Sequence, residues 1–486
     1  MRKNISERKL SLQKNFIFNF IYQILTLLLP LITTPYISRV LGADKIGIYS
    51  YSYAIISTFM MVGSLGIATY GQKEIASNRD KPQMVNFLFW EIFLLKIITM
   101  GISSIGLIIY ALYDRSYCIY YFVQMPFVIS AVLDISWIFQ GLERFDVIVI
   151  RNTFVKILGI ILIFLLVRQK DDLIIYLLIL GGSQLLGNLT AWAYASTTIS
   201  KPAIRGNYLK YHLKQTLVYF VPTIAYQVYA VLDRVMLGAI SNSNYQNGFY
   251  EQAHKIVGIV TSIYTAYNIV LRSRMSYYFS QNRIDAIKQQ FQDSLLVITF
   301  FSTSVSMGLF AITTGFVPWF FGEGFNEVSN ILYIFCPMIF IMGFSMCIGT
   351  HLLTPGGLQK QANIAQCIAA VLNLLFNFLL IPKFEAKGAA FASFISQLSV
   401  AIFYIPYAHK YINYREWIPS LIKNVFAGFM MIIVISYIKR ILSVGLISTA
   451  IEILIGALSY LLILAIFKDK FFKTILNHTK NILLKR

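Results

Sequence analysis

Long apolar runs recur along almost all of this 486-residue chain and constrain its fold more than any other feature. A helix needs about 20 mostly apolar residues to cross a bilayer. Only helices and closed barrels satisfy the backbone inside lipid, and runs of this length are those of helices. We therefore predict an all-α polytopic membrane protein with about fourteen spans, at residues 14–38, 44–70, 83–112, 117–140, 147–167, 172–196, 212–240, 248–271, 289–315, 328–352, 359–381, 388–408, 418–438 and 444–467.

Composition excludes a soluble globular protein. Hydrophobic residues make up 57% of the chain and charged residues only 13%, whereas soluble domains carry about 25% charged residues. The first apolar run is too long for a signal peptide and is predicted to be a true span. The four cysteines show no metal-binding or disulfide spacing, so we predict neither a metal site nor a cofactor.

The net charge of +20 follows the predicted topology. If the N-terminus is cytoplasmic, 28 of the 41 Lys and Arg residues fall on the cytoplasmic side and nine on the outer side. This asymmetry predicts that both termini are cytoplasmic. Because these bases would lie beside an anionic leaflet, we expect no nucleic-acid partner.

Four basic residues are assigned to neither side and are placed within the membrane: Lys96, Lys156, Arg234 and Lys255. The acids that we also place within the membrane are Glu91, Asp134, Asp233, Glu251 and Glu452. A charge at the centre of a span costs roughly 2.5–3.5 kcal/mol, so it normally faces the bundle interior or a watery cavity. Glu251 and Lys255 share a helix face, whereas Asp233 and Arg234 diverge. The bases are either partners in ion pairs between helices or the lining of a cavity for an anion.

Two polar stripes favour the cavity. One lies in the first span and comprises Asn15, Asn19, Gln23 and Thr26. The other lies in the seventh span and comprises Gln215, Tyr219, Pro222, Tyr226, Tyr229 and Asp233. Each stripe occupies one helix face. Polar packing between membrane helices is the alternative reading.

A weak internal repeat places the two stripes in equivalent positions. RVLG at 39–42 with GIY at 47–49 matches RVMLG at 234–238 with GFY at 248–250, and GLER at 141–144 matches GLQK at 357–360. Parallel repeats of this kind form a site at their interface. We predict an N-terminal lobe of six helices at 1–200, a C-terminal lobe of six helices at 201–411, and two further helices with a basic cytoplasmic tail at 412–486.

Motifs typical of enzymes do not occur in the sequence. It contains no GxxxxGK[ST], HExxH or GxSxG pattern, and its five histidines lack metal-binding spacing. We therefore predict a protein that is not an enzyme.

Several short segments resemble those of Wzx-type polysaccharide flippases in the MATE-like exporter superfamily for drugs, oligosaccharidyl lipids and polysaccharides. They are PYISRVLG at 35–42, WIFQGLERF at 137–145, DRVMLG at 233–238, NLLFN at 373–377, IP at 381–382 and GAA at 388–390. Their order covers nearly the whole chain. The resemblance implies a V-shaped pair of six-helix lobes in a bacterial cytoplasmic membrane.

The resemblance also implies a function: export of undecaprenyl-diphosphate-linked oligosaccharide to the outer leaflet by alternating access, driven by H+ or Na+, alongside polysaccharide polymerase machinery. The expected diphosphate contacts are Lys255, Arg234, Lys96 and Lys156, because basic residues offset the desolvation of an anion. Asn19, Gln23, Tyr226 and Tyr229 would contact sugar hydroxyls, and Arg39 would lie at the outer mouth. Glu91, Asp134, Asp233 and Glu251 are expected as coupling acids or counter-ions.

Three alternatives stay open. Drug exporters of the superfamily often carry an acid in the first span, but residues 15–38 contain none. Lipid II flippases typically carry arginines in the first spans, and here only Arg39 comes close. A membrane scaffold without transport would not need the basic residues inside the spans.

Overall fold

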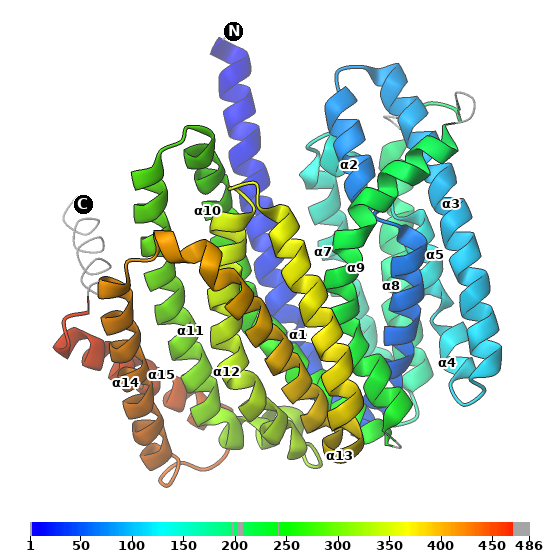
Figure 1. Cartoon of the computed structure of the whole chain (residues 1–486). Helices are drawn as coiled ribbons and strands as arrows, with labels where there is room; N and C mark the ends of the chain where they lie inside the picture. The colour runs from blue at the N-terminus through cyan, green and yellow to red at the C-terminus, as the bar shows by residue number, and fades with distance from the viewer. Residues whose placement is uncertain (1, 197–198, 203, 205–207, 242, 470–486) are drawn as a thin grey trace. The chain divides into compact units, whose positions relative to one another are not determined.

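The computed structural model of this chain is built from helices, with no strand among the residues that it describes (Figure 1). It describes residues 2–196, 199–202, 204, 208–241 and 243–469, without the side chains at 2–28, 145–151, 221–230, 263, 265, 266, 269 and 270. Within these ranges, nine helical segments are long and apolar enough to cross a membrane. The predicted all-α polytopic fold is confirmed.

The chain divides into two compact units, Met1–Val235 and Met236–Arg486. The first contains α1 (Arg2–Ser64), α2 (Ile67–Asn78), α3 (Pro82–Tyr113), α4 (Cys118–Val123), α5 (Met125–Leu133), α6 (Ser136–Gly141), α7 (Phe145–Leu166), α8 (Leu173–Ala195) and most of α9 (Leu209–Ile240). The second contains α10 (Asn244–Ser280), α11 (Ile284–Phe321), α12 (Glu327–Ile348), the π-turn η1 (Gly349–Leu353), α13 (Gln359–Ala408), the 3₁₀ turn η2 (His409–Tyr411), α14 (Tyr414–Ile438) and α15 (Leu446–Ile466). The division into six-helix lobes at residue 200 stays a prediction.

Two continuous helices are kinked where the sequence predicts a junction between spans. In α1 the kink lies at Gly42, with φ 74° and ψ 170°, a conformation that glycine adopts without steric cost. In α13 it lies at Glu385, with φ 50° and ψ −127°. When α1 and α13 are divided there and α4, α5 and α6 are taken as one broken segment, each predicted span corresponds to one helical segment, except that the span at 44–70 crosses the break between α1 and α2.

Aromatic packing fixes α2, α3, α6 and α8 in the first unit. Trp137 of α6 is 1% exposed, and its ring stacks on Phe89 of α3 with the centroids 5.5 Å apart. Phe93 meets Trp192 of α8 edge to face at 4.8 Å. A Cβ atom at Gly71 of α2 would lie 2.6 Å from Cε3 of Trp137. The close approach of α2 to α6 therefore depends on glycine at position 71.

We expect Gly71→Ala to lower the stability of the purified protein. Overpacking a core typically costs about 1–3 kcal/mol. Gly101→Ala in α3 is the matched control, because no atom lies within 4 Å of a Cβ there and both changes gain the same helix propensity. Thermal unfolding in detergent measures the difference. Equal unfolding temperatures for the two variants would contradict the packing argument.

Candidate functional site

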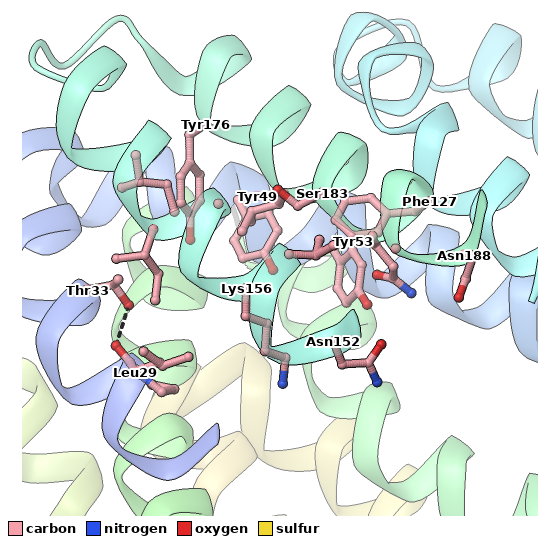
Figure 2. Close-up of a pocket in the computed structure, with 18 of the residues that line it drawn as sticks. Leu29, Thr33, Tyr49, Tyr53, Phe127, Asn152, Lys156, Tyr176, Ser183 and Asn188 are labelled. Carbon is pink, nitrogen blue, oxygen red and sulfur yellow. Dashed lines mark hydrogen bonds between the residues drawn. The ribbon is translucent and has the colours of Figure 1, made fainter. Parts of the chain in front are cut away.

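A cavity of about 550 Å³ lies within the first unit (Figure 2). Its lining residues come from α1, α5, the break after α5, α6, α7 and α8. Its lining includes two residues that the sequence singles out, Lys156 and Asp134. Its other polar and aromatic lining residues are Thr33, Tyr49, Tyr53, Phe127, Ser136, Asn152, Tyr176, Ser183, Gln184 and Asn188.

The lining combines one ammonium group with amides and tyrosines. Lys156 and Asn152 are four residues apart on α7 and therefore share a helix face. In Figure 2 their nitrogen atoms point the same way, on one side of the tyrosine rings. Tyr49 and Tyr176 meet edge to face with ring centroids 5.6 Å apart. The cavity therefore offers a cation, amides and hydroxyls beside aromatic faces.

The fourth predicted span is broken at the edge of this cavity. Between α5 and α6, Asp134 has an extended backbone, and its Oδ1 accepts a hydrogen bond from the Ser136 amide at 2.9 Å. The Asp134 carbonyl accepts a hydrogen bond from Nζ of Lys96 at 2.6 Å, and the Leu133 carbonyl accepts one from Nε1 of Trp192 at 2.9 Å. These side chains satisfy carbonyl groups that a continuous helix would use.

Lys96 therefore has a different position from Lys156. Its side chain is 4% exposed, and its amine is directed to the backbone at the helix break. Lys96 is not among the residues that line the cavity. The Lys96 ammonium group therefore supports the break, whereas Lys156 lines the cavity.

A second predicted acid, Glu91, has a partner that the sequence did not reveal. Its Oε2 lies 3.0 Å from Nε2 of His212 in α9, and Nδ1 of His212 lies 2.7 Å from the Tyr70 hydroxyl of α2. Glu91 is 0% exposed and His212 is 2% exposed. These two contacts join α2, α3 and α9 in the core of the first unit. His212 was overlooked because it stands at the very start of a predicted span, between Lys210 and Lys214 and far in the sequence from any acid.

The remaining predicted residues are placed as follows. Glu251 and Lys255 of α10 form the expected i,i+4 ion pair, with Nζ and Oε1 3.7 Å apart. Asp233 of α9 is buried, Arg234 is half-buried, and Arg39 of α1 is exposed. Asn19 and Gln23 belong to α1 and Tyr226 and Tyr229 to α9, but their side chains lie outside the described ones. No group of three or more His, Cys, Asp or Glu residues in the described ranges could hold a metal.

Comparison with known proteins gives one family and several relatives. The profile of a family described as polysaccharide biosynthesis proteins matches residues 12–277. A protein of Escherichia coli (strain K12) named as an O-antigen transporter is 24% identical over 79% of this chain and 94% of its own length. A protein of Haloferax volcanii named as a flippase of low-salt glycan biosynthesis is 22% identical over 78% of this chain and 80% of its own length.

Solved structures with similar folds include a lipid flippase and a multidrug transporter. The inward closed structure of the lipid II flippase MurJ has a TM-score of 0.73 at 16% identity, over 93% of this chain and 98% of that one. An inward-facing multidrug transporter of the MATE family has a TM-score of 0.58 at 12% identity, over 84% of this chain and 99% of that one. These similarities confirm the predicted MATE-like exporter fold.

Proposed function

This chain belongs to the polysaccharide biosynthesis protein family, and we propose that it is a flippase for lipid-linked oligosaccharides. It moves undecaprenyl-diphosphate-linked repeat units from the cytoplasmic to the outer leaflet of a bacterial cytoplasmic membrane by alternating access. The names of the Escherichia coli and Haloferax volcanii relatives support this cargo. Both termini are cytoplasmic in this proposal, as the distribution of Lys and Arg predicts.

The cavity in the first unit carries the proposal. Its volume of about 550 Å³ lies within the range of about 300–1,000 Å³ that is typical of small-molecule sites. The Lys156 ammonium offsets the desolvation of a phosphate, and the amides and tyrosines offer hydrogen bonds and flat faces to sugar rings. The lipid tail remains in the bilayer.

The contacts seen in the first unit support different roles for the charged residues. Lys156 contacts the diphosphate, and Asp134 holds the helix break beside it. Lys96 stabilises that break, and Glu91 is the counter-ion of His212.

The other predicted roles are retained in the proposal. Arg234 and Lys255 contact the diphosphate, with Asp233 and Glu251 as their counter-ions. Asn19, Gln23, Tyr226 and Tyr229 contact the sugar, and Arg39 lies at the outer mouth. H+ or Na+ drives transport, and polysaccharide polymerase machinery receives the product.

A deletion strain tests the function directly. We expect complete undecaprenyl-linked repeat units to accumulate on the cytoplasmic face, with loss of surface polysaccharide that the wild-type gene restores. Lysis with normal surface polysaccharide would instead indicate transport of lipid II. Sensitivity to drugs with normal polysaccharide would indicate a drug exporter. Either of these two outcomes would overturn the proposal.

We expect Arg234→Ala and Lys255→Ala, tested separately in that strain, to lower surface polysaccharide roughly tenfold to a hundredfold. A hydrogen bond to a charged group contributes about 1.5–3 kcal/mol, and 1.4 kcal/mol is a factor of ten. Lys360→Ala is the control, because Lys360 is exposed at the start of α13. Normal surface polysaccharide, with the variant present at the wild-type protein level, would show that the substituted residue does not bind the diphosphate.

A further inference from the structure

A second polar cavity lies in the other unit, where α14 connects to α15. It has a volume of about 210 Å³. Its polar side chains are Thr314 of α11, Lys439 and Ser443 between α14 and α15, and Thr449 and Glu452 of α15. None of these residues belongs to the substrate cavity in the first unit. Glu452 is an acid inside a membrane span to which the proposed transport cycle assigns no role.

Lys439 and Thr449 are hydrogen-bonded in this pocket, whereas one carboxylate oxygen of Glu452 is not. The Lys439 amine donates to the Ala311 carbonyl and to Oγ1 of Thr314. The Thr449 hydroxyl accepts a hydrogen bond from Nε1 of Trp319 at 2.7 Å. Glu452 is 4% exposed, and its Oε2 has no hydrogen-bond partner among the described residues. An ionised carboxylate that is buried without a donor is strongly disfavoured.

The space beside this carboxylate is left by Gly315. A Cβ atom at Gly315 would lie 3.7 Å from both carboxylate oxygens of Glu452 and 3.7 Å from Cε of Lys439. The carboxylate and the lysine stem therefore lie on the same side of α11, with room between them. The Lys439 amine nevertheless binds the backbone and a hydroxyl of α11.

Three kinds of occupant would satisfy Oε2 of Glu452. A metal cation would be repelled by the nearby Lys439 ammonium. A bridging water would leave the carboxylate charged in a buried position, although its hydrogen bond would be made. A proton removes the charge and turns the carboxyl into a donor.

We propose that this pocket is a proton-binding site, in which Glu452 carries the proton as a neutral carboxylic acid. When the site releases its proton to water, the carboxylic acid becomes a carboxylate, and the reverse step restores it. The distribution of Lys and Arg predicts that this end of α14 lies on the outer side of the membrane. A role of this proton in driving transport rests on the flippase function proposed above.

Few other ionisable groups face Glu452 among the described residues. Lys439, at the end of α14, is the charged residue in the lining, and burial lowers its pKa. The part of α11 that lines the pocket contributes Thr314 and Gly315, and the loop contributes Ser443. Tyr333 of α12 lies near Thr314 but is not among the residues that line the pocket.

Labelling with N,N′-dicyclohexylcarbodiimide tests the site without any transport assay, because the reagent reacts with protonated carboxyl groups. The full-length protein is labelled at several pH values, and the modified peptides are quantified by mass spectrometry. Glu91 is the internal control, since it is also buried but its Oε2 lies 3.0 Å from Nε2 of His212. We expect about tenfold more label at Glu452 than at Glu91 near pH 7, because a difference of about 1.4 kcal/mol in the cost of ionising the two carboxyl groups changes the ratio of protonated to ionised acid tenfold.

Two variants separate a bound proton from a water-bridged ion pair. Glu452→Gln should abolish the label at this peptide. Lys439→Met removes the charge that favours ionised Glu452, so labelling should persist to higher pH than in the wild type. Labelling of Glu452 in Lys439→Met alone, with none in the wild type, would overturn the proposal. Equal labelling of Glu91 and Glu452 would also overturn it.

Infrared spectroscopy gives a reading that does not depend on access of the reagent. The difference spectrum between the wild type and Glu452→Gln near pH 7 should contain the carbonyl band of a protonated carboxylic acid in the wild type. The absence of that band would overturn the proposal.

Transport in proteoliposomes tests whether the proton drives the cycle. We expect Glu452→Gln to lose the response of flipping to a pH gradient. If flipping by this variant still responds fully to the pH gradient, Glu452 does not couple the proton to transport. The proposed flippase function would not be affected by that result. If the wild type does not flip lipid-linked oligosaccharide at all, the flippase function fails, and the labelling result stands by itself.

Discussion

Replacing His212 by alanine is expected to destabilise the first unit by about 1–3 kcal/mol, the cost of leaving a buried hydrogen-bonding group without its partner. Glu91 and His212 are almost fully buried, so the carboxylate would stay in the core without its base. The Tyr70 hydroxyl would lose its partner on α9 as well. Thermal unfolding of the purified protein measures the change.

An ion pair of the same length on the surface provides the control. Nη1 of Arg79 and Oε1 of Glu143 are also 3.0 Å apart, but both side chains are at least 36% exposed. Exposed pairs contribute about 0–1 kcal/mol, so Arg79→Ala should change stability little. The double variant Glu91→Gln with His212→Ala should recover part of the loss, because no charge is then left in the core. Equal effects of Arg79→Ala and His212→Ala would contradict this account.

Replacing Lys156 by methionine is expected to lower flipping of lipid-linked oligosaccharide roughly tenfold to a hundredfold, because it removes a hydrogen bond to a charged group worth about 1.5–3 kcal/mol. Methionine keeps most of the length of the side chain, so the walls of the cavity should remain in place. Lys156→Arg should retain part of the activity, since the positive charge is kept. Proteoliposomes with a labelled lipid diphosphate oligosaccharide measure the rate.

Lys45→Met is the matched control for this cavity variant. Lys45 lies in the same unit. Its Nζ is 3.7 Å from Oδ1 of Asp171, and this ion pair reaches the surface, because the Asp171 side chain is 92% exposed. Lys45 does not line the cavity, and removing its charge should leave flipping near the wild-type rate. If both lysine variants flip normally, the cavity does not bind the diphosphate through Lys156.

Contacts close in sequence were predictable, and contacts between distant helices were not. The Glu251–Lys255 pair was expected because residues four apart face each other on any helix. Glu91 and His212 are separated by 121 positions and meet through the packing of α3 and α9. No local pattern in the sequence indicates that pairing.

The sequence also could not separate the buried bases by role. Lys96 and Lys156 look alike as lysines within apolar spans. The structure directs the Lys96 amine to a carbonyl at the break between α5 and α6 and places Lys156 in the lining of the cavity. The break itself carries a weak signal in the sequence, because Asp134 and Ser136 are polar residues inside a predicted span.

The all-α membrane fold and the approximate positions of most helical segments could be predicted from the sequence, including the junctions near Gly42 and Glu385 but not the break between α1 and α2. These properties follow from the cost of placing backbone and charge in lipid, which each segment bears on its own. The tertiary structure alone decided which acids have partners: Glu91 meets His212, whereas Oε2 of Glu452 faces a small polar pocket. Hydrogen bonds act only over a few ångströms, so that distinction depends on which helices pack together.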